Sequence, residues 1–169
     1  TFLVKHFSRL PVAPGARVFV PLCGKTRDIA WLLGEGFRVA GAELSRIAVE
    51  ELFAELAVGP EVTTDGALTR FSAPGLDILQ GDIFALTRDT LGSVDAVWDR
   101  AALVALPKDM RARYAPHLVA LTVAAPVAVA TLHVAHARPI VVVVGAVAAA
   151  ALVGWAALDR ALRRVVDGL

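Results

Sequence analysis

The chain has 169 residues, which is enough for one domain and too few for two of ordinary size. Its 17 basic and 16 acidic side chains leave a formal charge of +1. A chain with so little net positive charge is not expected to bind nucleic acid. The single cysteine, Cys23, excludes an internal disulfide, and no Cys/His cluster indicates a metal site. We therefore expect a cytoplasmic protein without metal or nucleic acid.

The sequence from Arg17 to Ala42 predicts a strand, a helix and a second strand. Arg17–Leu22 is a short apolar run, typical of a buried parallel strand. Thr26 caps the helix that follows, and Gly34 and Gly36 end it. Phe37–Ala42 is then the second predicted strand.

A second helix and a hairpin follow. Ser45 is the expected N-cap of this helix, and Pro60 ends it. Leu68–Phe71 and Leu76–Leu79 predict a hairpin whose second member is the third strand of the main sheet. The apolar stripe of the helix repeats at i, i+3, i+4 and i+7, at Val49, Leu52, Phe53 and Leu56.

The remaining predicted elements are two strands and a helix. Val94–Trp98 is the fourth strand, and a helix enters at Pro107, with Pro116 expected to kink or interrupt it. Pro126–Leu132 is the fifth strand candidate. Strands alternating with helices at this spacing predict an α/β fold with a doubly wound parallel sheet.

Ligands of such a sheet bind beyond the carboxyl ends of its strands. Gly24 follows the first strand and lets a ligand approach the backbone, although a plain tight turn explains it equally well. The three spaced glycines of a dinucleotide site are missing, which disfavours a nicotinamide-binding protein. Glu43 ends the second strand, where a carboxylate can accept hydrogen bonds from both hydroxyls of a ribose; the alternative is a solvated acid beside a helix cap.

Two further strand ends carry polar groups. Asp82 and Ile83 follow the third strand and suit the edge and face of an adenine, although Gly-Asp is also a common turn. Trp98, Asp99 and Arg100 end the fourth strand. Their convergence indicates a site, whereas the alternative is a surface ion pair between the last two.

Three stretches together resemble one family. "RVFVPLCGKTRDIAWLLGEGFRVAGAELS", "LQGDIF" and "VWDRAALVAL", in this order and at this spacing, are similar to the bacterial thiopurine S-methyltransferases, which are class I S-adenosylmethionine-dependent methyltransferases. The resemblance covers residues 2–125 and implies a Rossmann-like sheet. It also implies S-adenosylmethionine as cofactor and a small thiol or other chalcogen nucleophile as acceptor.

The resemblance assigns roles to individual residues. It implies that Leu22 lines the cofactor pocket beside Gly24, that Glu43 holds the ribose, and that Asp82 and Ile83 flank the adenine. Arg100 is then expected near the methyl donor and acceptor.

Chemistry adds two candidate catalytic residues. Arg100 is a fixed cation that could favour a thiolate, and Asp99 is a weaker candidate for the base, because a carboxylate is poorly matched to a thiol proton. Cys23 is interpreted as a packing residue of the turn. The side chains of His6, His117 and Lys25 are interpreted as structural or solvated.

The two ends of the chain depart from the family pattern. The tryptophan-rich segment with which family members begin is absent, and the similarity stops after about residue 131, so we expect a truncated N-terminus and an incomplete sheet. The domains predicted are a methyltransferase-like cofactor-binding domain over 1–132 and an apolar segment over 133–169. His133 and His136 are interpreted as part of a linker.

About twenty uncharged residues, 139–158, match the length of a transmembrane helix. The alternatives are a strand with a buried helix that completes the sheet, or a chimeric ending. An anchor would give the chain a membrane as a partner. The alternative function is therefore a non-catalytic, membrane-tethered S-adenosylmethionine-binding module.

Overall fold

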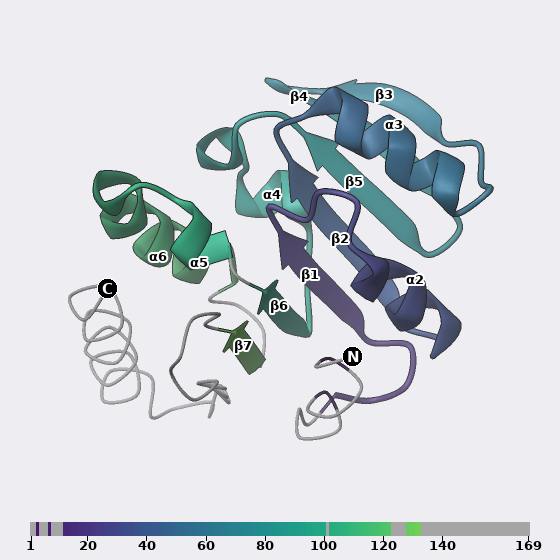
Figure 1. The fold of residues 1–169 in the computed structure, drawn as a ribbon, viewed down its shortest axis with the longest axis horizontal. Helices are drawn as coiled ribbons and strands as arrows, with labels where there is room; N and C mark the ends of the chain where they lie inside the picture. The colour runs from purple at the N-terminus through teal and green to yellow at the C-terminus, as the bar shows by residue number, and fades with distance from the viewer. Residues whose placement is uncertain (1–2, 4–6, 8–11, 101, 123–127, 133–169) are drawn as a thin grey trace.

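A computed structural model describes residues 3, 7, 12–100, 102–122 and 128–132 of the protein, which form a seven-stranded sheet with helices on both faces (Figure 1). The strands are β1 (Arg17–Pro21), β2 (Arg38–Glu43), β3 (Glu61–Asp65), β4 (Leu68–Ala73), β5 (Leu76–Gln80), β6 (Ala96–Arg100) and β7 (Ala128–Leu132). The helices are α2 (Arg27–Gly34), α3 (Arg46–Glu55), the 3-10 turn η2 (Ile83–Ala85), α4 (Arg88–Leu91), α5 (Ala102–Ala105) and α6 (Lys108–Thr122).

The strand order is β3-β4-β5-β2-β1-β6-β7, and β1 pairs parallel with both β2 and β6. After β1 the chain builds the sheet on the β2 side as far as β3, and β6 then starts the opposite side. The direction of winding therefore reverses between β1 and β6, and such a switch point is where ligands of doubly wound sheets bind. The predicted α/β, doubly wound fold is confirmed.

The outer strands β4 and β3 pair antiparallel, so the sheet is mixed rather than fully parallel as predicted. The hairpin of Leu68–Phe71 with Leu76–Leu79 is confirmed as β4 and β5, and β3 pairs antiparallel with the outer side of β4. The sequence of β3, EVTTD, is almost entirely exposed. Because it has no apolar alternation, the hydrophobic pattern did not predict this strand.

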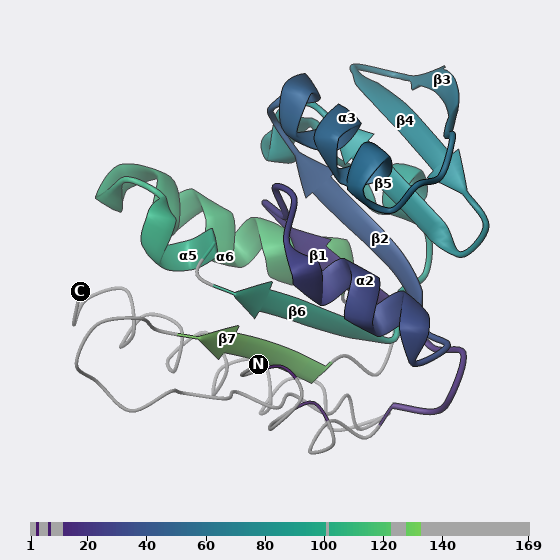
Figure 2. The ribbon, with the colours of Figure 1, turned by 45° about the vertical axis from the view of Figure 1, so that its right-hand side comes forward.

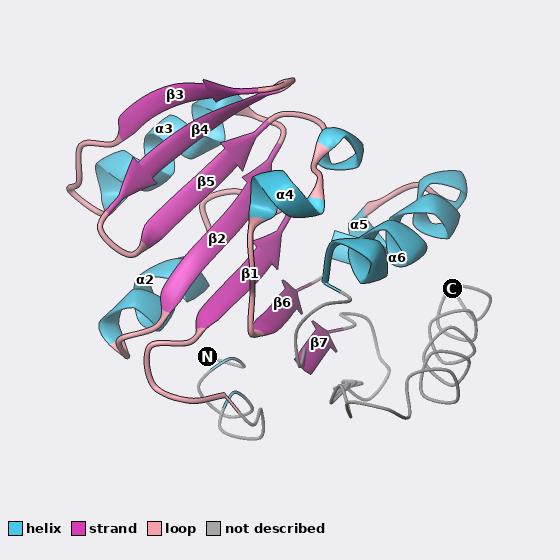
Figure 3. Ribbon diagram, turned by 180° about the vertical axis from the view of Figure 1, so that it is seen from behind, coloured by secondary structure: helices cyan, strands magenta, loops and turns pink. Residues whose placement is uncertain are grey.

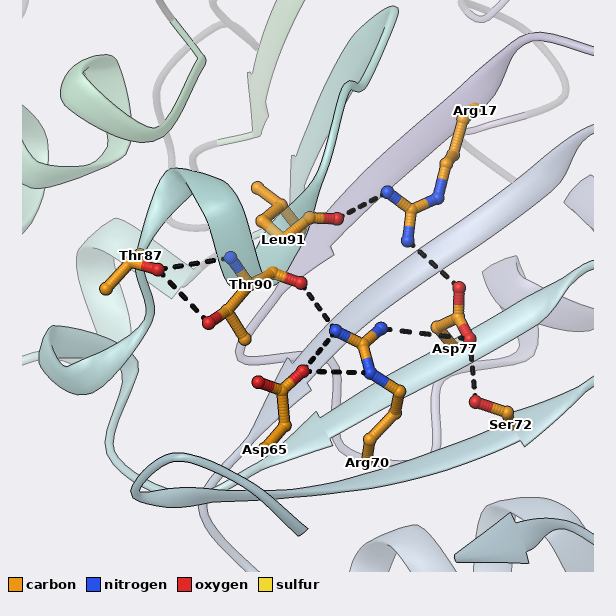
Figure 4. A network of polar contacts seen from close by, with 8 residues as sticks. All are labelled: Arg17, Asp65, Arg70, Ser72, Asp77, Thr87, Thr90 and Leu91. Carbon is orange, nitrogen blue, oxygen red and sulfur yellow. Dashed lines mark hydrogen bonds and ion pairs between the residues drawn. The ribbon is translucent and has the colours of Figure 1, made fainter. Parts of the chain in front are cut away.

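A network of ion pairs ties this hairpin to the rest of the sheet (Figure 4). Arg17 on β1 donates to Asp77 on β5 at 3.0 Å. Arg70 on β4 forms an ion pair with Asp65 on β3 and donates to the backbone oxygen of Thr90 in α4. The network thus joins four strands and α4, and its charges are partly buried and satisfied from several sides.

Two apolar cores lie on the two faces of the sheet. Helices α2 and α3 cover one face, and α4, α5 and α6 cover the other (Figures 1 and 3). Ile78 and Leu79 are neighbours on β5, and they enter the first and the second core respectively. This alternation is the period of two that a strand buried on both faces requires.

Helix α6 runs from Lys108 to Thr122 and includes Pro116, so the predicted interruption at this proline is wrong, while the alternative of a kink stays a prediction. Pro116 itself is exposed, while Tyr114, Leu118 and Leu121 on the same helix are buried in the second core. Packing of this apolar face offsets the hydrogen bond that a proline removes from a helix interior.

Strand β7 pairs parallel with β6 (Figure 2), which confirms the fifth predicted strand over Ala128–Leu132. The domain boundary after residue 132, the predicted helix over 139–158, and both His133 and His136 lie outside the described residues. Across the described ranges, no helix has both the length and the apolar character needed to cross a membrane.

Candidate functional site

The residues predicted to bind a ligand lie at one edge of the sheet. Strands β1, β2, β5 and β6 are adjacent and parallel, so their carboxyl ends meet at this edge (Figure 1). The residues at or directly after these ends are Leu22, Gly24, Glu43, Asp82, Ile83, Asp99 and Arg100. The structure therefore brings the backbone of every sequence-predicted site residue to the end of the sheet where the switch point lies, although the side chain of Asp99 is buried in the core.

Glu43 connects the ends of the two central strands. Its Oε2 accepts a hydrogen bond from the Gly24 N–H at 2.8 Å, and its Oε1 accepts one from the Ser45 N–H at 2.8 Å. The side chain is half-buried. A carboxylate held by two backbone donors is fixed in direction, and it retains lone pairs for further hydrogen bonds.

The turn after β1 has an unusual backbone. Leu22 has φ +46° and Gly24 has φ +52°, so two of three consecutive residues adopt the left-handed region. A leucine rarely does so, and such conformations are concentrated at functional sites. The space where a Cβ of Gly24 would point is open, with no described atom within 4 Å, and a ligand could therefore reach the backbone there.

Close packing beneath the turn requires a glycine in β2. A Cβ on Gly41 would lie 2.5 Å from Ile78 Cδ1 and 2.9 Å from Cys23 Sγ. Burial, with a smaller contribution from the negative charge of Glu43, raises the pKa of the Cys23 thiol to about 12. Cys23 is therefore a protonated, buried group at neutral pH, which agrees with its interpretation as a packing residue.

The third strand end carries an acid and an apolar side chain. Asp82 is exposed, and its Oδ1 accepts from the Phe84 N–H at 2.9 Å, which caps η2. Ile83 is only 8% exposed, and its backbone oxygen lies 2.8 Å from Nε2 of His117 in α6. The Gly81 N–H donates to the Glu43 backbone oxygen at 2.9 Å, which joins this turn to the end of β2.

Lys25 and His117 both have structural partners. Lys25 Nζ lies 2.9 Å from Glu51 Oε2 and 3.3 Å from Glu55 Oε1, and all three side chains are about half exposed. Besides its contact with Ile83, His117 packs against the ring of Phe84. The interpretation of Lys25 and His117 as structural or surface residues is confirmed, whereas His6 lies outside the described residues.

Asp99 lies in the core rather than in the open part of the edge. It is 1% exposed, Oδ1 accepts from the Ala102 N–H at 2.9 Å, and Oδ2 accepts from the Tyr114 hydroxyl at 2.9 Å. Burial, and then the charge of Asp99, raise the pKa of Tyr114 well above its ordinary value. These contacts tie Asp99 to α5 and α6, and its burial does not favour the predicted role as a base, because a ligand at the surface cannot readily reach the carboxylate.

Arg100 is half exposed, and its partner is a residue that the sequence did not single out. Arg100 Nε lies 3.2 Å from Oδ2 of Asp28, whose side chain is only 5% exposed. The same oxygen accepts from Trp98 Nε1 at 3.0 Å. One signal could have found Asp28: it stands one helical turn before Leu32, on the buried side of α2, where an acid is unusual.

The edge therefore combines groups of complementary chemistry. Glu43 and Asp82 present carboxylates that accept hydrogen bonds from hydroxyl and amino groups, and Arg100 presents a cation that suits a carboxylate or another anion. Two apolar residues lie next to these groups in the chain: Leu22 is partly buried against the second core, and Ile83 is buried in it. This set suits an amphipathic ligand that carries hydroxyls, a flat ring and a charged end.

Sequence comparison relates the chain to named proteins. Residues 1–138 match the family described as thiopurine S-methyltransferase (TPMT). The thiopurine S-methyltransferase of Xanthobacter autotrophicus is 92% identical over 125 residues, which are 74% of this chain and 59% of that protein. The enzyme of the same name from Pseudomonas syringae pv. pisi is 52% identical over 119 residues, or 70% of this chain and 55% of its own length. The chain thus spans less than two thirds of these curated relatives.

Solved structures share the fold at low sequence identity. A TehB-like S-adenosylmethionine-dependent methyltransferase from Corynebacterium glutamicum matches 95% of this chain and 70% of its own, with a TM-score of 0.57 and 15% identity. The glycopeptide N-methyltransferase MtfA, solved with sinefungin, matches 82% of this chain and 57% of its own, with a TM-score of 0.57 and 19% identity. The fold is that of these methyltransferases, and by its sequence the chain belongs to the thiopurine S-methyltransferase family.

Proposed function

We propose that the chain binds S-adenosylmethionine at the carboxyl edge of its sheet and transfers the methyl group to a small thiol or other chalcogen nucleophile. The observation that carries the proposal is the position of Glu43. Its carboxylate bridges the Gly24 and Ser45 N–H groups at 2.8 Å each, and thereby joins the carboxyl end of β1, a strand that borders the switch point, to that of β2. Family membership and the methyltransferase fold support the same activity.

The residues at this edge fit the parts of the cofactor. Glu43 is proposed to hold the ribose hydroxyls, and Asp82 the adenine amino group, with Ile83 and Leu22 against apolar surface. The open space where a Cβ of Gly24 would point supports the proposal that the cofactor lies against the backbone there. The guanidinium of Arg100 is proposed to hold the charged end of the cofactor close to the acceptor.

The chain's own contribution to methyl transfer is chiefly positional. S-adenosylmethionine, when bound, supplies a methyl group on a sulfonium, which a nucleophile attacks in line. The protein needs to hold both partners in that line and to keep water away, and it needs no catalytic triad for this. The rigid placement of Glu43 by two backbone donors serves the first need.

The acceptor side of the proposal rests on Arg100. A thiol becomes nucleophilic once it has lost its proton, and a nearby fixed cation favours the thiolate. Arg100 is half exposed at the end of β6, so its guanidinium can face a ligand at the switch point. Asp99 is proposed to support this strand end through Ala102 and Tyr114 rather than to take the proton.

Calorimetric titration with S-adenosylhomocysteine, the product form of the cofactor, tests the cofactor site. Wild-type protein should bind it saturably, and Glu43→Ala should weaken binding at least about tenfold, because hydrogen bonds from hydroxyls to a charged acceptor are lost. Glu50→Ala is the matched control: Glu50 is an exposed acid on α3, whose partner is Arg46 on the same helix. This control should leave the affinity unchanged.

A second measurement separates binding from catalysis. Wild-type protein that binds the product form should also generate it from S-adenosylmethionine when a thiopurine or another small thiol is added. Cofactor binding without such turnover would favour a non-catalytic binding module. A folded wild-type protein that does not bind, or an equal loss in both variants, would overturn the proposed site.

A further inference from the structure

Asp28 places a negative charge in the interior, where an acid needs specific partners. Its side chain is 5% exposed, on the side of α2 that packs against the sheet. Burying a carboxylate costs free energy unless hydrogen-bond donors and an opposite charge replace water. Its Oδ2 accepts a hydrogen bond from Trp98 Nε1 at 3.0 Å and forms an ion pair with Arg100, whose Nε lies 3.2 Å away, and both residues belong to β6.

Trp98 and Arg100 differ in the kind of partner that each side chain needs. The indole N–H of the buried Trp98 needs only a hydrogen-bond acceptor, and a neutral amide oxygen would satisfy it. The guanidinium of Arg100 is half exposed, so water could solvate it without any partner. Neither residue therefore needs a buried negative charge for itself, whereas such a charge attracts the half-exposed guanidinium of Arg100.

The location of Asp28 connects its ion pair with Arg100 to the candidate cofactor site. Its backbone N–H donates to Oγ1 of Thr26, so it belongs to the first turn of the helix that follows the glycine turn. The same short segment contains Gly24, whose N–H is bound by Glu43. Asp28 thus follows the glycine turn in the chain and forms an ion pair with the guanidinium at the end of β6.

We infer that Asp28 is the positioning residue of Arg100. Its buried carboxylate holds the Nε edge of the guanidinium, so that the remaining N–H donors face the carboxyl edge of the sheet. A guanidinium has five N–H donors, and the ion pair with Asp28 lies on its Nε side. The consequence for ligand binding rests on the function proposed above, whereas the positioning itself does not.

Nuclear magnetic resonance tests the positioning without any ligand. In the full chain, the Arg100 Nε–H signal, assigned by its loss in Arg100→Gln, should be resolved and protected from exchange with water. Asp28→Asn keeps the shape of the side chain and an acceptor for Trp98 but removes the charge, and it should abolish this protection. Trp98→Phe is the matched control, because it removes the other donor to Asp28 and should leave the Arg100 signal protected.

A double-mutant cycle tests the consequence for the site. Asp28→Asn should weaken the binding of S-adenosylhomocysteine about tenfold in wild-type protein and less than about twofold in the Arg100→Gln background, because residues that act through one contact are not additive. A merely structural Asp28 would weaken binding equally in both backgrounds. That result would overturn the inference, and so would an Arg100 signal that Asp28→Asn leaves unchanged.

Two other results are also decisive. If wild-type protein is folded but does not bind S-adenosylhomocysteine, the proposed function fails, and the resonance experiment still decides whether Asp28 holds Arg100. If Asp28→Asn does not fold, Asp28→Glu replaces it, since it keeps the charge and displaces the carboxylate by one methylene. An Arg100 signal identical in position and protection in Asp28→Glu would overturn the inference, and a shifted, less protected signal would support it.

Discussion

The hydroxyl of Tyr114 offers a sharp test of the buried contacts that hold the end of β6. Tyr114→Phe removes the donor that lies 2.9 Å from Asp99 Oδ2 and leaves the ring, so it creates almost no cavity. Asp99 is 1% exposed, and water cannot easily replace the lost donor. Loss of a hydrogen bond to a charged group costs about 1.5–3 kcal/mol, so we expect a decrease in the free energy of unfolding of this size.

The effect should depend on pH in one direction. The pKa of Tyr114 is raised in the folded protein, so the folded state retains the proton at pH values where the unfolded chain loses it. The stability linked to Tyr114 is therefore fully present below about pH 10, the ordinary tyrosine value, and is lost as the pH rises above it. Phenylalanine does not titrate, and the difference between the two proteins should shrink above that pH.

Urea unfolding followed by far-ultraviolet circular dichroism measures both effects. Cys23 also has a raised pKa, but it is present in both proteins and its contribution cancels in the difference. Tyr114 is the single tyrosine of the chain, so its ionisation can also be followed directly by tyrosinate absorbance. A difference below about 0.5 kcal/mol at neutral pH, or ordinary titration of the folded protein near pH 10, would refute the reasoning.

Two further expectations concern the core beneath the glycine turn. Gly41→Ala should lower the free energy of unfolding by about 1–3 kcal/mol, because its Cβ would lie 2.5 Å from Ile78 Cδ1 and force the packing apart. Gly34→Ala is the control, since no described atom lies within 4 Å of the position of its Cβ. An equal effect of both substitutions would contradict this account. Cys23 should resist alkylation by iodoacetamide at neutral pH in the folded chain and react once urea unfolds it, because its thiol is buried with a pKa of about 12. Rapid labelling of the folded protein, followed by mass spectrometry, would show that the thiol is accessible.

The sequence predicted those elements whose local signals and final environment agree. Thr26 and Ser45 are N-caps in both the pattern and the structure, and the apolar runs at β1 and β2 are buried central strands. The outer strand β3 gave no such signal, because an edge strand with polar residues on both faces has no hydrophobic period. Pro116 gave a misleading signal, because packing of the buried face of α6 outweighs the local preference of proline.

The candidate site was predictable where it follows from the ends of strands. Glu43 and Arg100 were expected at the carboxyl edge because each ends an apolar run, and the structure places both there. The place of Asp28 on the apolar side of α2 is a local signal, but its contacts with β6 were not predictable because no local pattern encodes them. Asp99, by contrast, was expected at the site because it precedes Arg100 in the sequence. Neighbouring side chains of a strand point to opposite faces, and that of Asp99 is buried in the core.

Binding and turnover report on different parts of this protein for a physical reason. The described contacts that hold Glu43 and Arg100 come from Gly24, Ser45 and Asp28, all of which belong to the well-packed sheet and its first two crossovers. Cofactor affinity therefore measures whether this part of the chain is correctly folded. Methyl transfer requires in addition an acceptor held in line and water excluded, and neither requirement is met by these contacts alone. A substitution that lowers the cofactor affinity thus identifies a defect in the folded sheet and its crossovers. A substitution that lowers turnover at unchanged affinity identifies a defect in holding the acceptor or in excluding water.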